Sequence, residues 1–269
     1  SKVPSVSSPM MENNTGFTTP TEFVELPSQG LLYPEGHPLH NKEEVEIRFM
    51  TAKDEDILSS QVLLKKGIML DRFIQNILVD KSIDPQDLYS GDRNAILISA
   101  RITGYGADYK VNVTCPSCTR TTDYEFDLSE YGVDYADNHE ELDLTITPNG
   151  TYLLETPRTK VQLEIRLLSG KTEKYLTDLS ESKRKNNILE TPLTDTLKMI
   201  IVSVSGNADR NHIETYVNNM PAYDSRHVRK IYSQITPNID LTKNFICPNC
   251  DIETQLEVPL TSDFFWPKL

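Results

Sequence analysis

The sequence predicts an α+β fold made of two duplicated units that a four-cysteine site joins. Three observations lead to this fold class. The stretches VTCPSC and FICPNC each hold a Cys-Pro-x-Cys turn, and together they contain all four cysteines of the 269-residue chain. Stretches before the two turns match each other at near-constant offsets. The residues after each turn alternate apolar and polar, which is the period of a half-buried strand.

The internal repeat is clearest around the cysteines. Cys115 and Cys247 lie 132 residues apart, and the same offset places Asp92 on Asp224. Further upstream the offset is 118, because VEIRFMTAKDEDIL matches LEIRLLSGKTEKYL. The change of offset implies an insertion in the second copy, of which ESKRKNNILETP is expected to form part. A weaker match pairs LPSQGLLYP with TPNGTYLLETP.

The first unit is expected to contain a strand, three helices, and two further strands on either side of the first cysteine turn. Thr51 and Asp92 are expected to cap helices at their N-termini. Gly67 and Gly104 are expected to end them. The expected elements are a strand at 44–50, helices at 53–66, 68–79 and 92–103, and a strand at 108–114.

The second unit is expected to repeat this order. Ser169 and Asp224 take the N-cap positions, and helices are expected at 195–206 and 227–235. A hairpin is expected around Pro148-Asn149-Gly150. The expected domains are a flexible arm at 1–22, the first unit at 23–132, a polar linker at 133–142, the second unit at 143–261 and an aromatic tail at 262–269.

The two cysteine turns predict one metal site. Each Cys-Pro-x-Cys turn directs two thiolates at one point, and Zn²⁺ accepts four thiolates in a tetrahedron. The predicted ligands are therefore Cys115, Cys118, Cys247 and Cys250, in a zinc-ribbon-like arrangement. Four thiolates leave no open coordination position, so the expected role of zinc is structural. Thioredoxin-like redox chemistry, iron, and a site shared between two chains remain alternatives.

Charge and composition exclude several classes of function. The net charge of −13 argues against nucleic-acid binding, which depends mainly on clustered Lys and Arg. No apolar run approaches the roughly 18–20 residues of a membrane span, and we expect a soluble protein made in a cytosol. The sequence lacks the short motifs of hydrolases, metalloproteases and nucleotide-binding enzymes. We therefore expect no enzyme and no small-molecule substrate.

The two ends of the chain are candidates for partner binding. The arm is rich in Ser, Thr, Pro and Asn, a composition that orders on a partner. Near the other end, Phe264, Phe265 and Trp266 form an aromatic cluster. The first interpretation is that these side chains pack back on their own domain. The alternative is that they anchor a partner protein, because aromatic residues dominate interface hot spots.

Five motifs between Phe23 and Leu128 point to a family. In order, they are LPSQGLLYPEG, EIRFMTAKDEDIL, KKGIMLDRFI, GDRNAILISARITGYG and VTCPSC, and together they resemble the T4-type bacteriophage baseplate hub proteins. Cys115 and Cys118 match the family's cysteine turn directly, whereas Cys247 and Cys250 are assigned from spacing and internal symmetry. The GDRNAILISARITGYG stretch with its cysteine turn also resembles some phage tail-assembly chaperones.

The resemblance implies a non-enzymatic virion protein of the tail baseplate, assembled in the host cytoplasm. Its implied partners are other baseplate hub, tail-tube or tape-measure proteins. The alternative that the resemblance leaves open is an assembly chaperone, which binds a tail component and is absent from the mature particle.

Overall fold

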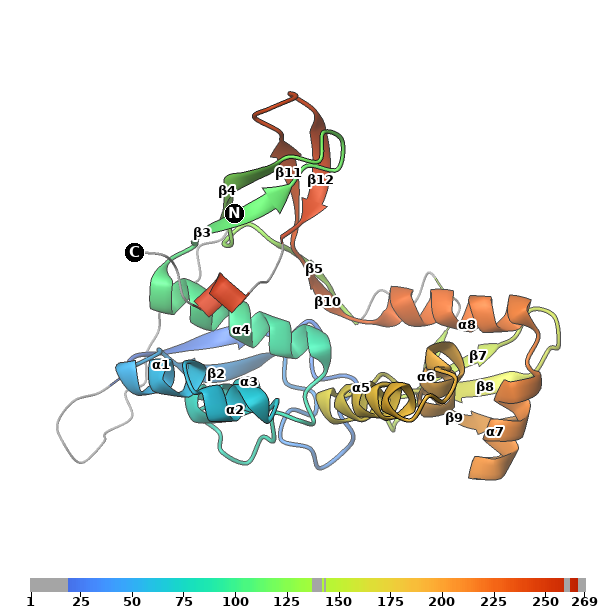
Figure 1. The fold of residues 1–269 in the computed structure, drawn as a ribbon. Helices are drawn as coiled ribbons and strands as arrows, with labels where there is room; N and C mark the ends of the chain where they lie inside the picture. The colour runs from blue at the N-terminus through green and yellow to red at the C-terminus, as the bar shows by residue number, and fades with distance from the viewer. Residues whose placement is uncertain (1–18, 137–141, 143, 259–261, 266–269) are drawn as a thin grey trace.

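The computed structural model describes residues 19–136, 142, 144–258 and 262–265 (Figure 1). The described helices are α1 (Ala52–Leu58), α2 (Gln61–Lys65), α3 (Met69–Ile77), α4 (Ser90–Tyr105), α5 (Gly170–Lys185), α6 (Pro192–Ile200), α7 (Arg210–Asn219), α8 (Ala222–Ile235) and the 3-10 helix η2 (Ser262–Phe265). The described strands are β1 (Thr21–Glu25), β2 (Glu44–Arg48), β3 (Asp108–Thr114), β4 (Thr121–Asp127), β5 (Gly132–Asp134), β6 (Thr145–Ile146), β7 (Tyr152–Glu155), β8 (Gln162–Ile165), β9 (Ile201–Val204), β10 (Asn238–Asp240), β11 (Thr242–Ile246) and β12 (Glu253–Glu257). The mixture of helices and strands confirms the α+β class.

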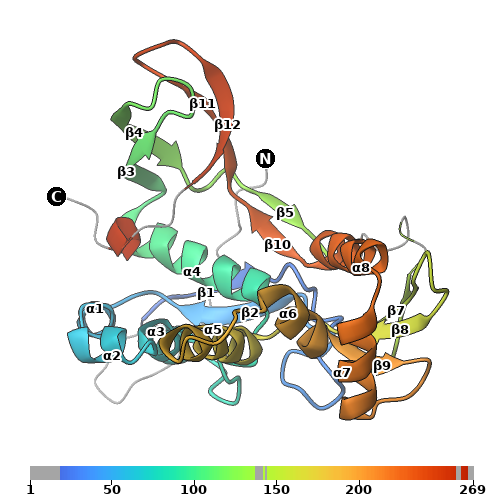
Figure 2. The ribbon, with the colours of Figure 1, turned by 45° about the vertical axis from the view of Figure 1, so that its right-hand side comes forward.

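The first unit is built on the antiparallel pair β1–β2, in which Val24 lies opposite Val45. A single bridge between Ile47 and Leu78 adds the segment after α3 along the other edge of β2. Figures 1 and 2 place α4 between this small sheet and the two hairpins β3–β4 and β11–β12. The helix α4 therefore carries the hairpins on one side and the sheet on the other.

The second unit contains a four-stranded sheet in the order β6-β7-β8-β9. Leu154 of β7 lies opposite Leu163 of β8, and β9 pairs with the other edge of β8. The strands β6 and β7 form the hairpin expected at 142–157. Its turn bends at Gly150, whose φ of 71° favours glycine.

The sheets of the two units share one register. The pairs Val24–Val45 and Leu154–Leu163 are equivalent, with Val45 and Leu163 at the expected offset of 118. In both units a segment that follows helices pairs with the other edge of the second strand of this pair. In the first unit this segment forms only the bridge at Leu78, and in the second unit it forms the full strand β9. The weak match of LPSQGLLYP with TPNGTYLLETP is wrong. LPSQGLLYP follows β1 and therefore corresponds to the residues that follow β7, whereas TPNGTYLLETP lies mostly before and within β7.

Asp92 and Asp224 do not cap their helices, which corrects a second expectation. Each is the third residue of its helix, α4 or α8. The buried carboxylate of Asp92 reaches the turn after β1, and that of Asp224 reaches the turn after β7. Asp92 accepts hydrogen bonds from Ser28 N at 3.0 Å and Ser28 Oγ at 2.6 Å. Asp224 accepts from Arg158 N at 2.8 Å and from Thr159 N at 3.1 Å. The same contact thus ties helix to sheet in both units.

Three helix boundaries also differ from expectation. The helix expected at 53–66 is broken, because Ser60 accepts a hydrogen bond from Leu63 N and starts α2 anew. The helix expected at 195–206 ends at Ile200 and continues as β9. Gly104 lies inside α4 rather than after it, where a Cβ would come within 2.8 Å of Met50 Sδ. The glycine therefore allows close packing and does not end the helix.

The expected linker begins with a strand. Val133 of β5 lies opposite Ile239 of β10, so the segment after the first hairpin pairs with the segment before the second. Two separate buried clusters complete the fold. One joins β1, β2, α3 and α4 to both hairpins, and the other surrounds β7–β9 with α6, α7 and α8. Among the described helices, none is both long and apolar enough to cross a membrane.

Candidate metal centre

The first cysteine turn connects β3 to β4 and is closed by backbone hydrogen bonds. Thr119 N donates to Cys115 O at 3.0 Å, and Cys115 N donates to Arg120 O at 2.9 Å. Thr119 has a φ of 60°, a left-handed conformation that a β-branched residue adopts at a cost. These bonds hold the backbone so that the Cys115 and Cys118 side chains lie on the same side of the turn.

The second cysteine turn, between β11 and β12, repeats this geometry. Asp251 N donates to Cys247 O at 2.9 Å, and Cys247 N donates to Ile252 O at 3.0 Å. Asp251 has a φ of 56° and occupies the position equivalent to Thr119. Each of these residues lies 132 positions after its counterpart in the first turn.

The two hairpins lie side by side (Figure 1) and pack through aromatic rings. The rings of Tyr124 and Phe245 meet edge to face, with 4.9 Å between their centroids. Phe245 is fully buried, as is most of Phe126 and Val258. Because one hairpin precedes the linker and the other ends the second unit, this packing brings distant parts of the chain together.

All four predicted ligands meet where the turns approach each other. Their four Sγ atoms lie within 4.8 Å of one another. Cys115 Sγ lies 3.8 Å from Cys250 Sγ, and Cys118 Sγ lies 3.8 Å from Cys247 Sγ. A zinc ion about 2.3 Å from each of four sulfurs would place neighbouring sulfurs about 3.8 Å apart. The donor set and its spacing therefore fit a tetrahedral metal ion.

The sulfur separations do not fit disulfides. A disulfide bond is about 2.05 Å long, and all four cysteines have free thiols. Cys115 and Cys247 are fully buried, whereas Cys250 is exposed at the rim. Asn249 N donates to Cys247 Sγ at 3.5 Å and lowers the pKa of that thiol to about 7. A lowered pKa favours the thiolate that metal binding requires.

Two aromatic residues of the tail, Phe264 and Phe265, lie within the described part of the chain. Phe264 is 4% exposed and Phe265 is 5% exposed, because both rings pack inside the first unit. Phe264 meets the ring of Tyr109, and Phe265 meets that of Phe73. Both rings thus pack back on their own chain, as the first of the two interpretations has it, and neither is presented to a partner. Trp266 lies outside the described residues.

Arg101 explains why the tail packs here, and the sequence did not single it out. This arginine is fully buried, and its Nε donates to Phe264 O at 2.6 Å. Its other guanidinium nitrogens donate to the carbonyls of Gly106 and Asp108. A buried arginine inside a predicted helix resembles any surface arginine in sequence, so no pattern signals this role.

Three further cations were also missed. Arg48, Lys53 and Lys81 border a pocket beside β2 and the end of α3. Arg48 and Lys53 lie in the repeated stretch VEIRFMTAKDEDIL, and there the sequence pattern indicates a repeat but no binding role. Lys81 stands in the polar turn DKSID, which gives no signal of its own.

Comparison with known proteins places the chain in a family. The family model described as T4 bacteriophage base plate protein matches residues 21–266. No curated protein and no solved structure matches the chain. The family match extends well beyond the motifs between Phe23 and Leu128, since it spans both units, both hairpins and all four cysteines. The chain therefore belongs to the family of T4 bacteriophage base plate proteins.

Proposed function

We propose that this protein is a structural subunit of the baseplate hub in a contractile-tailed bacteriophage. The observation that carries the proposal is the match to the base plate family over residues 21–266. Membership in this family implies a place in the virion tail and contacts with other structural proteins of the phage. The proposed partners are other hub proteins, the tail tube or the tape measure.

We further propose that the four thiolates hold one structural Zn²⁺. The sulfur separations of 3.8 Å support a tetrahedral site, and four thiolates leave no position for water or substrate. The ion would fix the hairpin β3–β4 against β11–β12 and so hold together the parts of the chain before and after the second sheet. Such a site contributes to folding, and the proposed role of the protein is assembly without catalysis.

The proposal also includes a duplication of the chain's basic unit. Three repeated features support it: the register of β1–β2 and β7–β8, the contacts of Asp92 and Asp224, and the backbone bonds of the two cysteine turns. A metal ion that fixes the two hairpins on the first core makes that core more rigid. Rigidity lowers the entropy cost of binding neighbours, which suits a subunit of a fixed assembly.

Quantifying this chain in purified mature particles tests the hub proposal. A hub subunit is retained, so we expect the chain at a fixed ratio to other baseplate proteins. If the chain is absent from mature particles while assembly still requires it, the protein is a chaperone that binds a tail component and then leaves. Mass spectrometry of intact tails, with a known baseplate protein as internal standard, gives the ratio directly.

Metal analysis tests the zinc site. We expect about one zinc per purified chain, and Cys118→Ser should lose it and lower the melting temperature by on the order of 10 °C. Ser117→Ala is the matched control, because Ser117 is exposed in the same turn and supplies no thiolate. Less than about half a zinc per chain, or an unchanged melt after verified metal removal, would contradict the proposal.

A further inference from the structure

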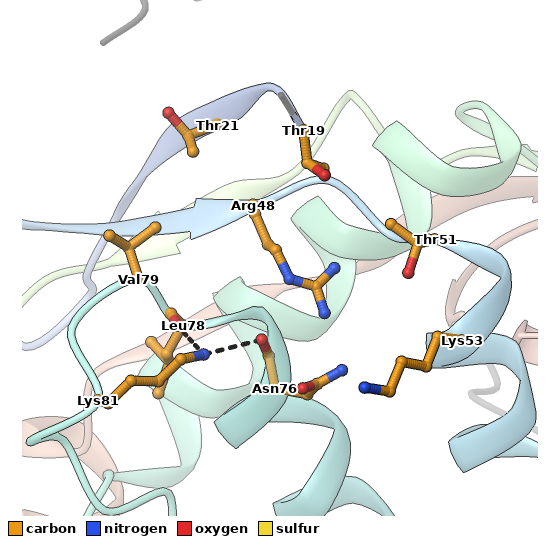
Figure 3. Close-up of a pocket in the computed structure, with 9 residues that line it drawn as sticks. All are labelled: Thr19, Thr21, Arg48, Thr51, Lys53, Asn76, Leu78, Val79 and Lys81. Carbon is orange, nitrogen blue, oxygen red and sulfur yellow. Dashed lines mark hydrogen bonds between the residues drawn. The ribbon is translucent and has the colours of Figure 1, made fainter. Parts of the chain in front are cut away.

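A pocket of about 400 Å³ lies beside the first sheet (Figure 3). Its walls come from the start of β1, the end of β2, the start of α1 and the segment that follows α3. The residues that border it are Thr19, Thr21, Arg48, Thr51, Lys53, Asn76, Leu78, Val79 and Lys81.

The pocket collects positive charge in a strongly acidic chain. Arg48, Lys53 and Lys81 border it, while the whole chain has a net charge of −13. Figure 3 shows the ends of all three side chains directed toward the region around Asn76. An anion entering the pocket would therefore meet three cationic groups.

None of the described residues that border the pocket is acidic, and the carboxylate of Asp54 behind them is already engaged. Asp54 is fully buried beneath the pocket and binds Arg48 through two hydrogen bonds of 2.7 and 2.8 Å. It also accepts hydrogen bonds from Thr51 and Asn76. One negative charge thus offsets one of three positive charges, and the pocket keeps an excess of two.

The two lysines have no carboxylate partner among the described residues, where no ion pair includes Lys53 or Lys81. The amine of Lys81 donates to the carbonyls of Gln75, Asn76 and Leu78 at the end of α3, so all three of its N–H groups are engaged. Burial, and then repulsion from Arg48, lower the pKa of Lys81, whereas Asp54 acts to raise it. Lys81 therefore contributes positive charge to the pocket but no free donor.

We propose that this pocket binds a carboxylate side chain from an acidic segment of a neighbouring protein in the baseplate. Lys53 can donate to the carboxylate, and Lys81 and Arg48 attract it electrostatically. The partly exposed Val79 offers apolar surface to the aliphatic stem of a glutamate. The acidic remainder of the chain repels phosphates and acidic peptides alike. The choice of a protein segment rests on the base plate family, whose members contact other structural proteins of the phage. The pocket's place in the baseplate rests on the proposed function, whereas its chemistry does not.

Peptide binding to the full chain tests the pocket. The probe is a capped hexaglutamate peptide, followed by nuclear magnetic resonance shifts of backbone amides around the pocket. We expect shifts at Thr51, Lys53 and Leu78, and a dissociation constant that rises at least about fivefold in Lys53→Gln. A hexaglutamine peptide should cause no shifts. Lys53 is exposed and holds no hydrogen bond that the structure records, so its substitution leaves the fold intact.

Lys171→Gln is the matched control, because Lys171 is exposed and occupies the position of Lys53 in the second unit. It removes the same charge, and we expect peptide binding to be unchanged. Equal weakening in Lys53→Gln and Lys171→Gln would overturn the proposal, because net charge alone would then explain binding. Absence of shifts at the pocket, or shifts with inorganic phosphate but not with the peptide, would also overturn it.

The outcome is separable from that of the hub proposal. Peptide binding by purified chain that is absent from mature particles would refute the hub role and leave the carboxylate chemistry in place. Retention of the chain in particles, with no peptide bound at the pocket, would refute the pocket alone.

Discussion

At the scale of single residues, Asp54 shows how a buried charge is stabilised here. Burial acts to raise the pKa of its carboxyl group. Hydrogen bonds from Arg48, Thr51 and Asn76 outweigh that effect and lower the pKa from 3.8 to about 2. A carboxyl group whose pKa is lower in the folded state stabilises the fold above the unfolded pKa, and this stability is lost as the pH falls through the folded value.

Asp54→Asn should be less stable than the wild type at neutral pH, and this difference in unfolding free energy should shrink as the solution is acidified. The shift of Asp54 corresponds to about 2 kcal/mol, present above about pH 4 and mostly lost near pH 2. We expect the difference in unfolding free energy between wild type and variant to shrink by about that amount over this window. Urea titrations at stepped pH measure it. Asp56→Asn, an exposed change on the same helix, should show no such trend.

Phe265 allows a second test at this scale. Phe265→Ala would leave a cavity against Phe73 and should lower the unfolding free energy by about 3–5 kcal/mol. Leu189→Ala is the control, because Leu189 is 81% exposed and should change stability by less than about 0.5 kcal/mol. Urea denaturation gives both values. A cost below about 1 kcal/mol for Phe265→Ala would mean that the tail does not pack in solution as described.

The residues that the sequence predicted well are those with fixed spacing. The four cysteines could be found because two C-x-x-C pairs have few uses, and the structure brings their sulfurs together. Phe264, Phe265 and Arg101 could not be placed, because burial depends on long-range packing. Asp92 looked like a cap, yet its partner is 64 residues away.

At the scale of elements, one difference between the two cysteine turns falls at the position with left-handed backbone. Thr119 and Asp251 both adopt the left-handed conformation, but Asp is better tolerated there than a β-branched residue. Thr119→Asn should therefore stabilise the metal-loaded chain by up to about 1 kcal/mol. Asp251→Asn should change stability by less than about 0.5 kcal/mol. Denaturant titration in excess zinc compares them, and a destabilising Thr119→Asn would refute the strain argument.

Hairpins and long helices were predictable where local pattern and tertiary pairing agree. The strands β3 and β4 alternate apolar and polar residues and flank a turn motif, so both signals coincide. The stretch DTLKMIIVSVSG was read as one helix, but Ile201–Val204 is rich in β-branched residues and pairs with β8. Whether these residues continue the helix or form a strand depends on the free edge of β8 that is available for pairing. The local sequence of this stretch does not contain that information.

At the scale of the whole molecule, the boundaries in sequence and in space differ. The sequence predicts that the second unit ends at residue 261, but the buried residues of β10 and β11, and Val258 directly after β12, belong to the core of the first unit. Ile239, Phe245 and Val258 are among them. The last part of the chain therefore completes the first core, and the metal site lies on that core and not between two independent domains.

Hydrogen exchange tests this organisation. Removing the metal should raise exchange in β3, β4, β11 and β12, because these strands hold the four ligands. The strands β7 and β8 belong to the other buried cluster and should keep their protection. Mass spectrometry of exchanged peptides, with and without chelator, separates the two sets. An equal rise in both sets would show that the chain unfolds as one cooperative unit.

The completion of the first core by the last strands has a consequence for synthesis. Cys115 emerges from the ribosome well before Cys247, and at typical translation rates of about 5–20 residues per second the delay is roughly 7–26 s. During that time the first pair of thiols has no second pair, and the surface that Phe245 and Phe265 will cover is open. The nascent chain can finish its first core only after β11 and β12 have been made, so the synthesis of this hairpin sets the earliest time at which the core and the metal site can form.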